Sequence, residues 1–141
     1  MKTPYHRMTQ GLLLASGLLL TSIAATILFA PGPFYAGYGI DVSSNVSLAN
    51  ELKAPSLLLL AAGAFMLLGV FRRSFVVPAL ALGTLIYASY GLSRLASIAI
   101  DGVPQTGLIG AAGVELVVGL LCLGALLRER GGRFSWNTVV R

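Results

Sequence analysis

The sequence contains little cysteine, little histidine and little charge, and each shortage excludes a class of protein. Cys122 is the sole cysteine, so the chain can form neither an internal disulfide nor a cysteine-rich metal site. Charged residues make up 11% of the 141 residues, whereas soluble domains average about 25%. Disordered chains are rich in charge, so disorder is excluded as well. What is present is an apolar chain, 56% hydrophobic, whose apolar surface a soluble domain of this size could not bury.

The usual signatures of catalysis are also missing. The chain has no CxxC pair, no HExxH motif, no glycine-rich phosphate loop before a lysine and no GxSxG elbow. We therefore predict no catalytic residue and no metal ligand, and a non-catalytic role is favoured over an enzyme. The net charge of +5 would suggest nucleic acid in a soluble protein. In so apolar a chain it indicates a membrane instead, and no nucleic-acid partner is expected.

Four apolar runs dominate the sequence. They predict helices over about residues 11–30, 53–71, 75–100 and 107–127, followed by a cytoplasmic polar tail, 128–141. A bilayer core about 30 Å thick needs roughly 20 helical residues, so each run can span it. No internal repeat divides the chain. The predicted fold class is all-α: a single integral membrane domain, built as an antiparallel four-helix transmembrane bundle.

The connections between these runs are mostly short, which favours antiparallel neighbours. Residues 72–74 and 101–105 form compact turns. The longest predicted loop covers residues 31–50, and its aromatic residues Tyr35 and Tyr38 suit the headgroup layer of a membrane.

Basic residues are distributed unequally between the two sides of such a bundle. Eight of the ten fall on the side that holds both chain ends and the turn between the second and third helices: Lys2, Arg7, Arg72, Arg73, Arg128, Arg130, Arg133 and Arg141. Since the positive-inside rule places an excess of Lys and Arg in the cytoplasm, both termini are predicted to be cytoplasmic. A cleavable signal peptide is the competing interpretation of the first helix. Its uncharged run of 20 residues exceeds the roughly 7–15 apolar residues of a signal peptide.

Ionisable residues inside the apolar runs are the main functional signal. A charge at the membrane centre costs about 2.5–3.5 kcal/mol on insertion scales and commonly marks a functional site. Glu115 lies about nine residues into the fourth helix, and Arg94 lies about six residues before the outer end of the third. Glu51, Lys53 and Asp101 stand at the same outer ends. Five charges from three helices are therefore predicted to converge on one end of the bundle.

Helical spacing places several of these residues on facing surfaces. Tyr87, Tyr90 and Arg94 follow i, i+3 and i+7, and Asp101 continues the same face. Small residues one turn before and one turn after Glu115 allow the third helix to approach closely. We therefore predict that Arg94 forms an ion pair with Glu115.

Two interpretations of this pair stay open. The pair can be structural and fix the register of the two helices, with Asp101 and Lys53 solvated at the interface. Alternatively, the same cluster can bind a polar ligand or take part in a proton-linked function. Tyr87 and Tyr90 carry a similar ambiguity, because tyrosines in membranes more often pack or anchor than bind ligands.

The polar cluster carries a family resemblance in four segments: Asn50-Glu51-Leu52-Lys53-Ala54, Tyr90-Gly91-Leu92-Ser93-Arg94, residues 97–104, and Glu115-Leu116. Together they resemble an uncharacterised bacterial membrane family, domain of unknown function 4345, which is similar to the wider DoxX-like four-helix group. The resemblance covers roughly residues 10–127. It implies a four-helix bundle in the bacterial inner membrane. Some DoxX-like proteins are accessory subunits of quinone-linked or thiol-linked oxidoreductases, and a single cysteine argues against the thiol-linked role here.

Three functions are compatible with these features. The first is a non-catalytic accessory or ligand-binding protein that uses Arg94, Glu115 and Asp101. The second is a subunit of a quinone-linked oxidoreductase, with Tyr87 and Tyr90 near the quinone; a quinone is the one cofactor that the sequence leaves open. The third is a dimeric proton-coupled small transporter with Glu115 as the proton carrier. The lack of an ionisable residue within the first apolar run counts against the transporter.

The expected partners follow from the membrane assignment. They are membrane lipid and either a partner membrane protein or a second copy of the chain. Gly110, Gly113 and Gly119 on the fourth helix would allow close helix packing, within one chain or between chains. From these we predict weak self-association.

Overall fold

A computed structural model describes residues 4–136 of the chain, with side chains described for residues 7–131. Its regular elements are all helical: α1 (Pro4–Phe29), α2 (Pro31–Ala36), α3 (Val46–Lys53), α4 (Ser56–Phe71), the 3-10 turn η1 (Arg73–Phe75), α5 (Val76–Asp101) and α6 (Thr106–Trp136). Four segments are long and apolar enough to cross a membrane, the second of them formed by α3 and α4 together. The predicted all-α, four-helix transmembrane fold is confirmed.

Two element boundaries differ from the prediction. Helix α6 continues to Trp136, so residues 128–136 of the predicted tail are helical; residues 137–141 lie outside the described part. Arginine and glutamate are good helix formers, and arginines favour the end of a helix, where its dipole is negative. The predicted loop 31–50 also contains helix α2 and the start of α3. The Asn45 side chain caps α3 by accepting a hydrogen bond from the Leu48 backbone nitrogen at 3.0 Å.

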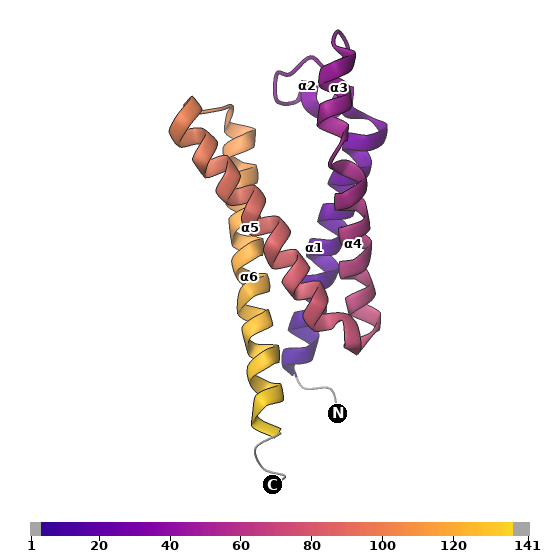
Figure 1. The fold of residues 1–141 in the computed structure, drawn as a ribbon, viewed down its shortest axis with the longest axis vertical. Helices are drawn as coiled ribbons and strands as arrows, with labels where there is room; N and C mark the ends of the chain where they lie inside the picture. Colours follow the sequence, from indigo (N-terminus) through magenta and orange to yellow (C-terminus); the bar gives the residue numbers. More distant parts are fainter. Residues whose placement is uncertain (1–3, 137–141) are drawn as a thin grey trace.

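The four long helices form two hairpins. Helix α1 packs along α4, and α5 packs along α6, while α4 and α5 are joined through η1 (Figure 1). At the end that carries Arg72 and Arg73, here called the basic end, the two hairpins pack against each other. Toward the opposite end, here called the loop end because it carries α2, α3 and the α5–α6 turn, the hairpins diverge (Figure 1).

The packed part of the bundle has one layer to which every long helix contributes. Leu13 of α1, Met66 of α4, Leu80 of α5 and Cys122 of α6 are completely buried. Gly83 of α5 permits this close packing, since a Cβ there would lie 2.7 Å from the Met66 methyl carbon and 3.2 Å from the Cys122 sulfur. Cys122 is therefore a small core residue.

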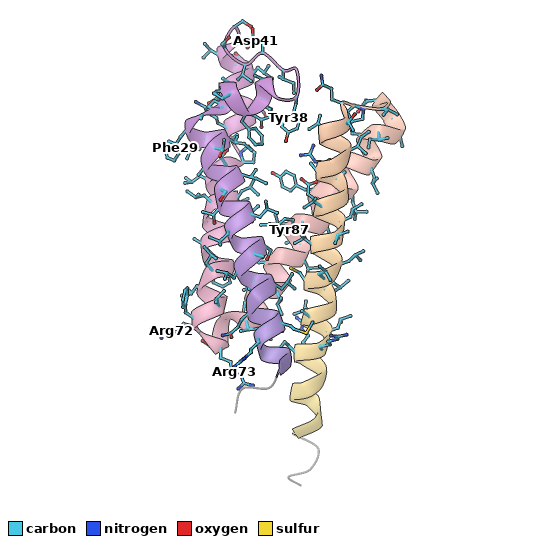
Figure 2. The ribbon with its side chains drawn as sticks, turned by 180° about the vertical axis from the view of Figure 1, so that it is seen from behind. Phe29, Tyr38, Asp41, Arg72, Arg73 and Tyr87 are labelled. Carbon is cyan, nitrogen blue, oxygen red and sulfur yellow. The ribbon has the colours of Figure 1, made fainter. Side chains whose placement is uncertain are left out.

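A hydrogen bond between the hairpins marks the edge of this packed region. The Tyr87 hydroxyl of α5 donates to the Ser16 carbonyl oxygen of α1 at 2.6 Å, and the Tyr87 side chain is buried. Figure 2 shows Tyr87 between the two hairpins. Beyond Gly91, residues 92–101 of α5 are all described and none of them is buried. The hairpins are thus tied at Tyr87 and separate from there toward the loop end.

Candidate functional site

The predicted ion pair forms in the divergent half of the bundle. The Arg94 Nε donates to Glu115 Oε2 at 2.9 Å, and it is the one ion pair between residues of the described chain. The exposed fractions of the two side chains are 34% for Arg94 and 17% for Glu115. Arg94 lies seven residues beyond Tyr87, which is about 10 Å along α5. The pair therefore stands outside the packed core, within two predicted membrane spans.

Close packing of α5 on α6 brings these two side chains together. A Cβ on Gly119 would lie 2.9 Å from the Ala88 backbone nitrogen, and one on Gly91 would lie 2.7 Å from the Leu116 Cγ. Gly91 precedes Arg94 by about one turn, and Gly119 follows Glu115 by about one turn. Because Gly91 and Gly119 have no side chains, α5 and α6 approach closely enough for the ion pair to form.

Tyrosines from two parts of the chain lie near the pair. Tyr90 precedes Arg94 by one turn of α5 and packs partly against the core. Tyr35 comes from α2. Burial raises the pKa of the Tyr35 hydroxyl, Tyr90 raises that pKa further, the Arg94 guanidinium opposes the rise, and Tyr38 adds to it. The ionisation of Tyr35 thus responds to both Tyr90 and Arg94 of α5.

The loop between α2 and α3 reaches across to the other hairpin at the loop end. A Cβ on Gly107 would lie 3.0 Å from the Tyr38 ring, and one on Gly39 would lie 2.6 Å from the Gln105 amide nitrogen. Figure 2 shows Tyr38 pointing from this loop toward the α5–α6 hairpin. Gly39 has a backbone φ of +71°, a conformation that favours glycine at this contact. The two hairpins therefore touch again beyond the ion pair.

The structure joins some of the predicted site residues and leaves others apart. Arg94 and Glu115 are in contact, and Tyr90 is beside them. Tyr87 is buried, and its hydroxyl is already used by the Ser16 carbonyl. Asp101 is exposed at the end of α5, where it accepts a hydrogen bond from Ser97 at 2.9 Å.

The two predicted residues of α3 also stand apart from the pair. Glu51 is exposed and Lys53 is partly exposed, and neither side chain forms an ion pair or hydrogen bond within the described chain. The five charges share one end of the bundle, but only two of them meet.

Tyr35, Tyr38 and Gln105 are neighbours of the site that sequence reasoning did not assign to it. The sequence places Tyr35 and Tyr38 in a loop and gives them an anchoring role. Edge-to-face contacts between the Phe34 ring and the rings of Tyr35 and Tyr38, at centroid distances of 5.1 and 5.5 Å, hold this aromatic group together. The sequence does contain three aromatic residues within five positions, but this pattern does not predict the direction in which the loop turns.

Comparison with known protein families identifies the family of this chain. Residues 8–126 match the family described as Domain of unknown function (DUF4345). The chain belongs to this family. The matched region includes Tyr35, Tyr90, Arg94 and Glu115, and the predicted membership of this family is confirmed. No curated protein and no solved structure matches the chain.

The titration of Tyr35 tests whether α2 lies against the ion pair. Tyr35 is expected to ionise above its ordinary pKa of 10.0. Because the pKa of Tyr35 is higher in the folded state than in the unfolded chain, the protonated side chain stabilises the fold fully below pH 10.0. This contribution is lost as the pH rises through the folded-state pKa. The tyrosinate absorbance of the wild type minus that of Tyr35→Phe gives this midpoint.

Because the Arg94 guanidinium favours the phenolate, Arg94→Leu should move the Tyr35 midpoint still higher, whereas Arg72→Leu at the basic end should not move it. An unchanged or lower midpoint in Arg94→Leu would show that α2 does not lie near α5.

Proposed function

We propose that this protein is a non-catalytic accessory or ligand-binding membrane protein, which holds the polar group of a membrane-dissolved molecule at Arg94, Glu115 and Tyr90. The observation that carries the proposal is the position of the Arg94–Glu115 pair. Charged residues in membrane spans are costly, and most face the interior of a bundle or a water-filled cavity. Here the buried residues of α5 end at Gly91, and the pair joins α5 to α6 beyond that level, where the two hairpins diverge (Figure 1).

A purely structural pair is less consistent with this position. Helix register is already fixed by the close approaches at Gly91 and Gly119, which lie on the same α5–α6 interface. The pair also leaves about a third of the Arg94 side chain exposed. An ion pair that serves only to fix register repays its desolvation when its remaining donors and acceptors are also hydrogen-bonded. These features support a site that interacts with something outside the chain.

The test is to purify the protein in mild detergent and to identify co-purifying lipids, quinones and proteins by mass spectrometry. The matched variant is the double change Arg94→Leu with Glu115→Leu, which keeps the helices and leaves no unpaired charge. The proposal predicts a molecule that is retained by the wild type and depleted at least about tenfold in the double variant, which corresponds to about 1.4 kcal/mol. Identical co-purifying sets would refute it, and a quinone with a redox protein would instead indicate a quinone-linked subunit.

The same proposal includes a location: the bacterial inner membrane, with both termini in the cytoplasm and the loop end outside, as in a DoxX-like four-helix protein. The basic end supports this orientation, because it carries five exposed arginines among the described side chains: Arg7, Arg72, Arg73, Arg128 and Arg130. Reporter fusions after Arg141 and within residues 72–74 are expected to be active in the cytoplasm. A fusion at Ser44, between α2 and α3, should report the outside, and an outside signal at Arg141 would contradict the orientation.

A further inference from the structure

We infer that the ligand of the Arg94–Glu115 site is an uncharged, lipid-soluble molecule that presents a carbonyl oxygen, and that it enters sideways between the two hairpins. This inference rests on the proposed function and goes further by naming the class of ligand. Three features carry it: the hydrogen-bond donors that the site leaves free, its net charge, and the contacts that cross its two ends.

The site has more free donors than acceptors. Arg94 uses Nε on Glu115, and its two terminal NH₂ groups make no hydrogen bond to any residue of the described chain. The hydroxyl groups of Tyr35 and Tyr90 likewise have no partner among the described residues, whereas the similar hydroxyl of Tyr87 has one. Lipid hydrocarbon contains no hydrogen-bond acceptors, so donors without a partner are energetically costly there. A ligand that completes the site must therefore bring acceptors.

The charges at the site cancel, which selects an uncharged acceptor. Arg94 is positive, Glu115 is negative, and their hydrogen-bonded atoms are 2.9 Å apart. An anion placed on the free NH₂ groups would stand close to the Glu115 carboxylate and would be repelled strongly in a medium of low dielectric constant. A cation would meet the guanidinium in the same way. A carbonyl oxygen accepts the free N–H and O–H groups without adding charge.

Contacts across both ends of the site favour entry from the lipid phase. Toward the basic end, the hairpins are joined by the Tyr87–Ser16 hydrogen bond and the core below it. Toward the loop end, Tyr38 lies against Gly107. Between Tyr87 and the end of α5 the hairpins diverge over 14 residues, about 21 Å of helix. Among the described residues, no hydrogen bond or ion pair joins the hairpins between these two contacts, which leaves entry from the side.

The test compares probes that share a hydrocarbon chain and differ in their polar group. Methyl palmitate carries an uncharged carbonyl, hexadecanesulfonate a permanent negative charge, and hexadecane no polar group. A short-chain benzoquinone represents the second source of carbonyl groups. Apparent Kd is obtained from the thermal stabilisation of the purified full-length protein in detergent. We expect methyl palmitate or the quinone to bind at least about tenfold more tightly than hexadecane, and the tighter of the two identifies the source of the carbonyl. Hexadecanesulfonate should bind no better than hexadecane.

Variants connect the binding to the named donors. Tyr35→Phe and Tyr90→Phe each remove one hydroxyl and keep the ring, and each should weaken carbonyl binding about twofold to tenfold. Tyr5→Phe, the same change in the first turn of α1 at the basic end, should leave the affinity unchanged. The double variant Arg94→Leu with Glu115→Leu should bind methyl palmitate no better than hexadecane.

The possible failures separate the two proposals. Preference for hexadecanesulfonate that is lost in the double variant would overturn the ligand class and leave the binding function standing. Equal binding of all probes, in both the wild type and the double variant, would overturn both proposals.

Discussion

The free energy of unfolding is expected to fall by about 3 kcal/mol when Glu115 is replaced by glutamine, the low end of the range for breaking one partner of a buried ion pair. The reason is that Arg94 would then hold its charge within a membrane span with only a neutral neighbour. A guanidinium cannot lose its proton under ordinary conditions. The change Arg94→Leu should cost less, because a carboxylate left alone can take up a proton and become neutral.

The double change Arg94→Leu with Glu115→Leu should recover much of the loss, since replacing both partners by apolar residues is often nearly neutral. Thermal or denaturant unfolding of the two single variants and the double variant in one detergent measures the coupling between the residues. Lys53→Leu serves as the control, because Lys53 has no ion-pair partner among the described residues. Losses that simply add in the double variant would show that the 2.9 Å contact contributes nothing to stability.

The Arg94–Glu115 pair was predictable because the membrane leaves few alternatives. These are the two charged residues in the interior of the third and fourth apolar runs, at similar distances from the same side of the bundle. Helical spacing then places them on facing surfaces. The cost of an unpaired charge in hydrocarbon makes any other arrangement unfavourable. The four helices were predictable for a related reason, since bilayer thickness fixes their length.

The surroundings of the pair were not predictable from the same rules. Tyr35 lies in α2, which begins directly after α1, and its ionisation responds to Tyr90 and Arg94 of the other hairpin. The periodic spacing of hydrophobic residues in the sequence does not predict such a turn of the backbone. Tyr87 shares a helical face with Tyr90, but its hydroxyl meets the Ser16 carbonyl because the hairpins touch at that level. The point at which they diverge depends on tertiary packing, which spacing along one helix does not contain.

The role of the glycines was also only partly predictable. Their presence in a membrane helix indicates close packing but does not identify the helix that packs against them. Of the three glycines predicted to mediate packing on α6, Gly119 lies against Ala88 of α5. A Cβ added at Gly110 or Gly113 would meet no atom of the described chain within 4 Å, so both glycines face outward. Weak self-association through these two glycines stays a prediction. A close approach of the same kind also joins α1 to α4, at Gly63.

Enlarging Gly63 to valine is accordingly expected to destabilise the protein by about 3 kcal/mol, the upper end of the usual cost of overpacking. A Cβ at Gly63 would press on the Thr21 hydroxyl and would lie 2.9 Å from the Thr21 backbone nitrogen and 3.1 Å from the Gly17 carbonyl oxygen. Two of these three atoms belong to the backbone of α1, so relief requires the helices to move apart rather than a side chain to turn. The whole α1–α4 hairpin would have to shift.

The matched control is Gly113→Val on α6, where a Cβ would meet nothing within 4 Å. It changes the same residue type in a helix and should alter the free energy of unfolding by less than about 1 kcal/mol, since it removes a poor helix former and adds no collision. Unfolding of both variants and the wild type in one detergent gives the comparison. A loss at Gly63 no larger than that at Gly113 would mean that α1 and α4 are not in close contact. The first hairpin would then lack the fixed geometry from which α2 extends.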